Sequence, residues 1–143
     1  MSRTAAFLAS TLVCATVLSG CGGGSAYCDA VKKDKASLNT FGEKRTDVAY
    51  AGYAKVFEGV AKVAPQDIKK DWQALADVTK GVIAAQKAVK LKLEDMTDTA
   101  KVKKLDATQL KQLNTAYEAF NGTTAQRTAV VKNVKQQCKI TLK

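Results

Sequence analysis

The cysteines are the residues of this chain whose type and spacing could do chemistry. The chain has 143 residues, with four cysteines and no histidine. A thiol can be acylated, can pair in a disulfide, or can act as a nucleophile, and the last use normally needs a neighbouring base such as histidine. Because histidine is absent, imidazole cannot serve as a general base or as a metal ligand. The thiols therefore suit covalent attachment and crosslinking better than catalysis.

Cys21 follows a short apolar segment near the beginning of the chain. Residues 4–18 carry no charge, and they are fewer than the roughly 20 residues that a helix needs to span a bilayer. The run Leu18-Ser19-Gly20-Cys21 resembles the lipobox of bacterial lipoproteins. The resemblance implies a signal peptide over residues 1–20, cleavage before Cys21, and lipid on the Cys21 thiol. An ordinary secretory signal with an incidental cysteine is the alternative.

The lipobox predicts the organisation of the rest of the chain. Residues 21–25 would form the lipidated cysteine and a flexible Gly/Ser tether, and residues 26–143 would form one helical domain. Two or more acyl chains hold a protein stably at a membrane, whereas one chain binds only marginally. We therefore expect the protein at the cell membrane, lipid-anchored, on the extracytoplasmic face.

Cys28 and Cys138 remain once Cys14 leaves with the signal peptide and Cys21 takes lipid. An even pair of cysteines in an exported protein is typical of a disulfide, and two free thiols are the alternative. In the chain-entropy model, closing so long a loop constrains the unfolded state by about 4–5 kcal/mol.

Apolar residues recur at helical spacing throughout residues 26–143, which predicts an all-α fold. We expect an antiparallel bundle of four or five helices whose N- and C-terminal helices are joined by the disulfide. Gly52 and Gly59 would let a neighbouring helix approach closely, which would make the second helix central. Asp106 and Gln109 have the spacing of a capping box. The first three expected helices cover residues 26–40, 46–63 and 65–93. A fourth begins at the Asp106 cap and is stopped by Asn121-Gly122, and a fifth, capped by Thr123 or Thr124, turns Val130, Val131, Val134 and Cys138 inward. Residues 94–104 are expected to form a polar loop, with one helical turn in it as the alternative.

Three short pieces of the chain resemble small exported helical lipoproteins of high-GC Gram-positive bacteria. They are Tyr27-Cys28-Asp29, the run APQDIKKDW over residues 64–72, and Cys138 in the final helix. The resemblance implies a helical bundle bracketed by two cysteines and an exported location. It implies no catalytic or binding residues.

Candidate sites for a metal or a ligand are few. Glu94, Asp95 and Asp98 could offer oxygen ligands to a hard cation, but their spacing does not match an EF-hand, and a solvated loop is the favoured interpretation. We expect no metal, no cofactor and no catalytic residues.

An aromatic stripe recurs at helical spacing, and core packing is its favoured interpretation. A carrier of an apolar ligand, in a cleft between the second and third helices, is the alternative function. The aromatic residues are Tyr50, Tyr53, Phe57, Trp72 and Phe120.

The formal net charge is +10, and lysine accounts for all but three of the 23 basic residues. Nucleic-acid recognition favours arginine, so we expect no nucleic-acid partner. The disulfide would bring lysines from both ends of the domain together in a membrane-proximal basic end. Its members would be Lys32, Lys33, Lys35, Lys132, Lys135, Lys139 and Lys143.

The sequence thus predicts a non-catalytic, lipid-anchored, extracytoplasmic helical module. It would contact the membrane through Cys21 and would bind an envelope protein, anionic lipid or an anionic cell-envelope polymer. A lysine-rich surface that only promotes solubility is the alternative interpretation of the charge.

Overall fold

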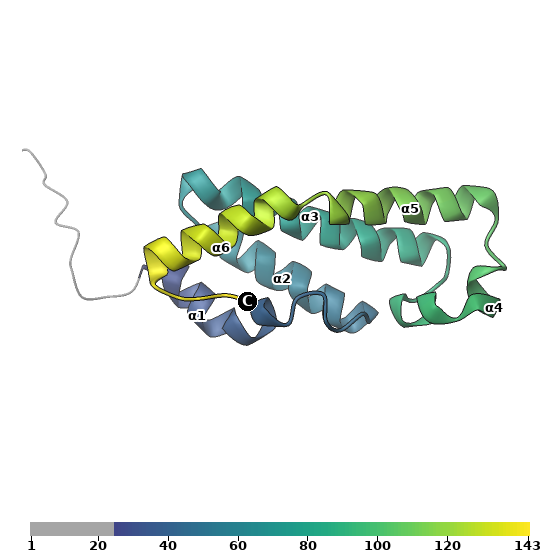
Figure 1. Ribbon diagram of the computed structural model, residues 1–143, viewed down its shortest axis with the longest axis horizontal. Helices are drawn as coiled ribbons and strands as arrows, with labels where there is room; N and C mark the ends of the chain where they lie inside the picture. The colour runs from purple at the N-terminus through teal and green to yellow at the C-terminus, as the bar shows by residue number, and fades with distance from the viewer. Residues whose placement is uncertain (1–24) are drawn as a thin grey trace, which may run out of the picture.

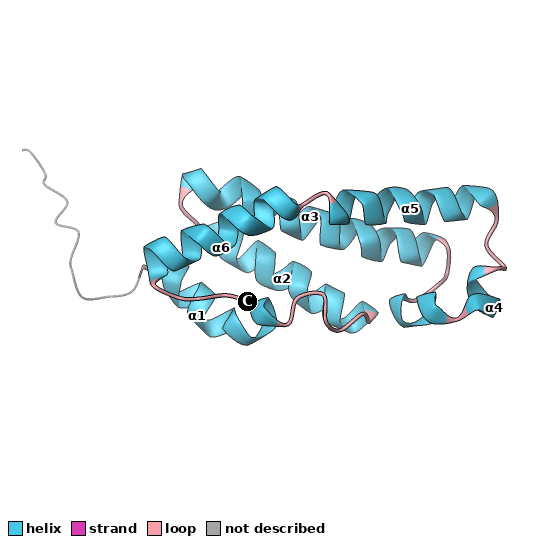
Figure 2. Cartoon of the chain, in the orientation of Figure 1, coloured by secondary structure: helices cyan, strands magenta, loops and turns pink. Residues whose placement is uncertain are grey.

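Residues 25–143 are described by a computed structural model, and they fold as an all-α bundle (Figure 1, Figure 2). Within this range no residue belongs to a strand, so the predicted fold class is confirmed. The predicted signal peptide and Cys21 lie outside the described residues. The helices are α1 (Ala26–Asn39), α2 (Asp47–Val63), α3 (Gln66–Ala88), α5 (Ala107–Asn121) and α6 (Thr124–Cys138), with the short η1 (Leu93–Thr97) and α4 (Thr99–Val102).

The helices form an antiparallel bundle whose last member consists of two consecutive helices, α5 and α6, which we call the α5–α6 rod. Successive helices α1, α2 and α3 alternate in direction, and α5 and α6 follow one another in the same direction, antiparallel to α3 (Figure 1). None of the helices within residues 25–143 has the combination of length and apolar character needed to cross a membrane.

Side-chain caps begin several helices where the sequence indicates them. The hydroxyl oxygen of Ser25 accepts a hydrogen bond from the Cys28 N–H at the start of α1, and Thr46 caps α2 in the same way. At the start of α5, Asp106 Oδ1 accepts from the Gln109 N–H at 2.8 Å, and Gln109 Oε1 accepts from the Asp106 N–H at 3.0 Å. This reciprocal pair is the predicted capping box.

The third helix ends earlier than its apolar spacing predicts. It ends at Ala88, because Lys90 adopts a left-handed conformation with φ of 56°. The Lys90 N–H then bonds the Lys87 carbonyl, and the Leu91 N–H bonds the Gln86 carbonyl. These two bonds form a Schellman motif, which usually carries glycine at the left-handed position. With lysine there, the sequence offers no stop signal, and the predicted extension to residue 93 is wrong.

A chain of side-chain hydrogen bonds crosses the core near the disulfide. The indole N–H of Trp72 on α3 donates to the Tyr27 hydroxyl of α1 at 3.1 Å. That hydroxyl donates to Asn133 Oδ1 of α6 at 2.9 Å. Burial raises the pKa of Tyr27, against the opposing effect of the Trp72 hydrogen bond. Trp72 is fully buried, so its one polar group needs this partner.

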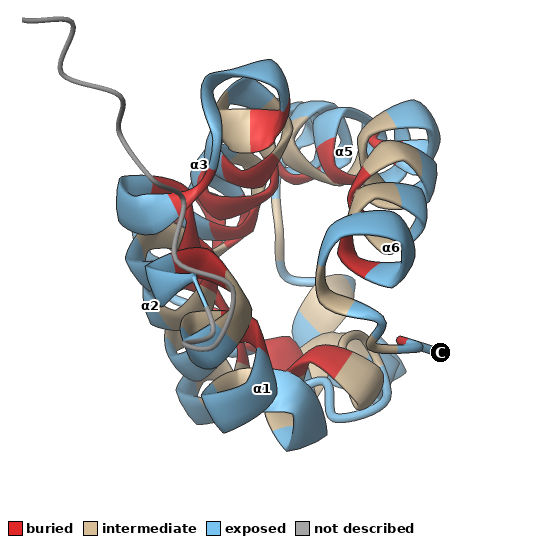
Figure 3. Cartoon of the chain, turned by 90° about the vertical axis from the view of Figure 1, so that its left-hand side faces the viewer, coloured by how far each residue is buried: buried red, intermediate tan, exposed pale blue. Residues whose placement is uncertain are grey.

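The central helix is α3 rather than α2. α3 packs against α2, α5 and α6, whereas α2 packs mainly against α1 and α3 (Figure 3). Gly52 and Gly59 lie on the exposed side of α2, and a Cβ atom built on either would meet no atom within 4 Å. The expected close approach of a helix at these glycines is therefore wrong.

Replacing Gly52 or Gly59 by alanine should stabilise the protein by about 0.5–1 kcal/mol each, because alanine has the higher helix propensity and nothing blocks its methyl group. Urea unfolding followed by circular dichroism measures the change. Gly42→Ala is the control and should destabilise, since Gly42 has φ of 84°. A loss of stability in both α2 variants would contradict the packing described here.

Candidate functional site

The disulfide ties the beginning of α1 to the end of α6. The Cα atoms of Cys28 and Cys138 lie 5.2 Å apart, within the usual range for a disulfide, and the bond spans 110 residues of sequence. The predicted pairing is therefore the one in the structure. Apart from this bond, the Tyr27–Asn133 hydrogen bond and a small contact, α1 and α6 share little packing.

Lysines line the junction of α1 and α6 beside the disulfide. Lys32 and Lys35 follow Cys28 by four and seven residues, so they lie on the same side of α1 as the cysteine. Lys135 precedes Cys138 by three residues and lies on the cysteine side of α6. Lys139 follows the bond directly, and its ammonium donates to the Gln136 carbonyl. We call the exposed lysines 32, 35, 135, 139 and 143 the basic seam.

The C-terminal tail, residues 139–143, extends this seam along α1. Leu142 is buried, and the Lys143 backbone N–H donates to Asn39 Oδ1 at 3.0 Å. Lys143 therefore lies at the far end of α1, as the path of the tail in Figure 1 shows, and not beside the disulfide as expected.

Two of the predicted lysines lie off the seam. Lys33 is five residues from Cys28, and Lys132 is six residues from Cys138, so each points about 120–140° away from its cysteine. The seven lysines thus form a stripe with two outliers instead of one basic end.

The seam contains no acidic side chain. α6 and the tail have no aspartate or glutamate, and the two acids of α1, Asp29 and Asp34, lie about 100–120° from Cys28. Among the described residues, the ion pairs join Lys80 to Glu58 and Asp77, and Lys101 to Asp95. Among the described residues, no ion pair therefore involves a seam lysine, and Asp29, three residues before Lys32 on α1, is the nearest acid in helical register.

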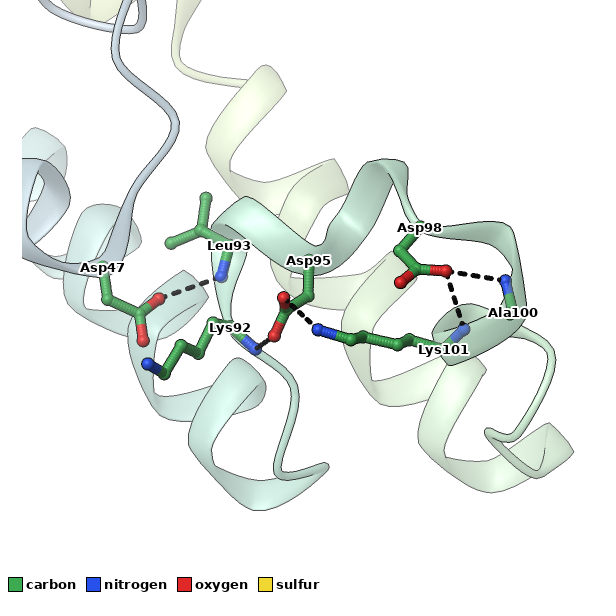
Figure 4. Close-up of polar contacts among 7 residues, drawn as sticks. All are labelled: Asp47, Lys92, Leu93, Asp95, Asp98, Ala100 and Lys101. Atoms are coloured by element: carbon green, nitrogen blue, oxygen red, sulfur yellow. Dashed lines mark hydrogen bonds and ion pairs between the residues drawn. The ribbon is translucent and has the colours of Figure 1, made fainter.

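The carboxylates of Asp95 and Asp98 hold the backbone of residues 92–101 (Figure 4). Asp95 pairs with the Lys101 ammonium at 2.6 Å and accepts from the Lys92 N–H, and the ammonium holds the pKa of Asp95 below its usual range. Asp98 Oδ1 caps α4 by accepting from the N–H groups of Ala100 and Lys101.

Glu94 joins the same segment to α2. Its carboxylate accepts from the Asp47 N–H at 3.1 Å, and the Asp47 carboxylate accepts from the Leu93 N–H at 3.0 Å. Within residues 25–143, no group of three or more metal-ligating side chains converges on one point.

The aromatic residues of the predicted stripe are buried and contact one another. Phe41, in the turn after α1, packs edge-on against Tyr53 and Phe57, and Tyr50 stacks on Phe120 with ring centroids 5.6 Å apart. The stripe therefore builds the core. Between α2 and α3 lies a polar groove of about 300 Å³, lined by Glu58, Lys69 and their neighbours.

Two pockets lie on the other side of the core, between the α1–α2 region and the α5–α6 rod. The tail pocket, about 230 Å³, is bounded by α1, α2, α3, α6 and the C-terminal tail. The loop pocket, about 660 Å³, is bounded by the turn over residues 41–45, by η1 and by α5. Phe41 and Arg127 line both pockets and therefore stand between them.

Arg127 is the residue of this region that the sequence analysis missed. Its guanidinium lies over the rings of Phe41 and Phe120, with centroid distances of 5.2 Å and 4.7 Å. Its Nη2 donates to the Phe120 carbonyl at 3.0 Å, and its Nε donates to Thr123 Oγ1 at 3.1 Å. These bonds satisfy the backbone where α5 ends and α6 begins. The sequence does not indicate this role, because a single arginine in an amphipathic segment has no pattern that distinguishes it from a surface arginine.

Both arginines of the loop pocket lie near the Tyr50 hydroxyl. Burial raises the pKa of Tyr50, and the charges of Arg45 and Arg127 oppose that rise. Glu43 and Glu94 line the same pocket, but neither forms an ion pair with Arg127.

Comparison with known proteins adds no relative: no protein-family model, no curated protein and no solved structure matches this chain.

Proposed function

We propose that this protein is a non-catalytic, lipid-anchored module of the extracytoplasmic membrane face, and that its basic seam rests on anionic lipid head groups. The observation that carries the proposal is the seam itself. Five exposed lysines follow the junction of α1 and α6, and no carboxylate of α6 or the tail shares it. A positive surface of this kind gains about 1 kcal/mol per lysine close to an anionic membrane.

The predicted anchor supports the same arrangement. Seven peptide units separate Cys21 from Cys28, and such a segment reaches about 25 Å when fully extended. The seam begins at Cys28 and follows α1, a helix about 20 Å long. A lipid on Cys21 would therefore keep the seam within reach of the head groups.

Replacing Cys21 by serine should remove the anchor. In cells given an alkyne-tagged palmitate, the unchanged protein should carry the tag and sediment with membranes. The Cys21→Ser protein should carry no tag. When residues 1–20 are also removed from this variant, only the seam remains, and a large fraction of the protein should leave the membrane at high salt. Tagging of the Cys21→Ser protein, or an untagged native protein, would contradict the proposed anchor.

The seam is tested in the processed chain, residues 21–143 with Cys21→Ser, with vesicles of neutral or of anionic lipid. Binding to anionic vesicles should weaken tenfold or more when Lys32, Lys35 and Lys135 are all replaced by glutamine. The variant loses up to about 3 kcal/mol of attraction, the value expected when all three lysines lie close to the membrane surface. Vesicle sedimentation at two salt concentrations measures the affinity.

A matched control removes the same charge elsewhere. Lys55, Lys87 and Lys111 are exposed lysines on α2, α3 and α5 that form no ion pair with any described residue. Their triple glutamine variant should bind anionic vesicles nearly as well as the parent. Equal weakening by both triple variants would overturn the seam in favour of net charge alone. Binding to a purified anionic wall polymer but not to vesicles would overturn the lipid proposal.

A further inference from the structure

The two pockets around Arg127 suggest a ligand site beneath the basic seam, and Lys143 of the seam lines one of them, the tail pocket. We infer that the tail pocket and Arg127 together bind a small aliphatic monocarboxylate, with the carboxylate on the guanidinium and the hydrocarbon chain in the tail pocket. Arg127, Val130 and Leu142 of this site are not among the seam lysines, so its ligand binding can be measured without a membrane.

Arg127 has hydrogen-bond donors that no described residue uses. A guanidinium has five N–H groups, and the contacts to Phe120 and Thr123 use two of them. The side chain is half-buried over two aromatic rings, and no carboxylate of the described residues pairs with it. A partly buried cation with free donors is complementary to a carboxylate, which arginine binds through two parallel hydrogen bonds.

The tail pocket fits the hydrocarbon chain of the ligand. Behind Arg127, the tail pocket is walled mainly by apolar side chains, among them Leu38, Phe57, Trp72, Val130 and Leu142. Its volume of about 230 Å³ exceeds that of an engineered apolar cavity of about 150 Å³ that takes a benzene molecule. The pocket is therefore large enough for a short hydrocarbon chain, and its polar lining, which includes Arg127 and Lys143, lies beside these apolar walls.

The charged residues of the loop pocket bear on the charge of the ligand's head group. The loop pocket on the other side of Arg127 carries Arg45 but also Glu43 and Glu94. These two carboxylates offset the charges of Arg45 and Arg127, so the lining has no net formal charge. A doubly charged phosphate therefore gains no advantage there over a singly charged carboxylate that pairs with Arg127.

Trp72 provides a direct measurement, because it is the only tryptophan of the chain and it lines the tail pocket. Full-length protein with Cys21→Ser is titrated with octanoate brominated at its ω end or at its α carbon, since bromine quenches a nearby indole. The ω-bromo compound should quench Trp72 saturably and several-fold more strongly than the α-bromo compound. Equal quenching by the two compounds, or the absence of saturable quenching, would overturn the inference.

Two variants test the head group. Arg127→Gln should weaken ω-bromo-octanoate about tenfold and leave the uncharged ω-bromo-octanol unchanged. Arg45→Gln removes the same charge at the exposed edge of the loop pocket and should have a much smaller effect. Equal weakening by both variants, or an unchanged affinity in Arg127→Gln, would overturn the assignment of Arg127. Retained binding of the alcohol shows that Arg127→Gln is folded, and if this variant does not fold, the comparison of the two brominated acids in the parent still decides.

Discussion

The attachment of α6 to α1 is the constraint on which the rest of the structure depends. Helix α3 holds α2 on one side and the α5–α6 rod on the other, but it does not bring α6 to α1. That contact relies on the Cys28–Cys138 bond and on the hydrogen bonds that run from Trp72 through Tyr27 to Asn133. A covalent bond across so long a loop acts chiefly by restricting the unfolded chain, whereas the buried hydrogen bonds select one arrangement of the three helices.

Both proposed sites, the basic seam and the tail pocket, depend on this attachment. Because α1 and α6 meet at their ends more than along their lengths, the tail can lie over their junction, and Leu142 can close the tail pocket. The same junction brings the lysines of α1, α6 and the tail into one stripe on the outside. Beneath this junction, Arg127 stands between the tail pocket and the loop pocket, because its guanidinium covers the end of α5 and stacks on Phe41 and Phe120.

The sequence predicts those features that depend on local patterns and on cysteine pairing. Helical spacing locates the helices, the Asp106–Gln109 spacing predicts the capping box, and the two remaining cysteines predict the disulfide. It does not predict the end of α3, because Lys90 occupies a left-handed position where glycine would have been a signal. Asn133 and Arg127 are also missed, since their partners lie far away in sequence or depend on the break between α5 and α6. Helical register places Lys32, Lys35 and Lys135 on the seam, but only the path of the tail locates Lys143.

Hydrogen exchange of the oxidised and the reduced protein tests the central role of this attachment most directly. Under native conditions, reduction of the Cys28–Cys138 bond should speed exchange in α6 and the tail well before it does so in α2 and α3, because α2 and α3 keep their mutual packing. Faster exchange by the same factor in all of the long helices would contradict the account, and so would unchanged exchange in α6.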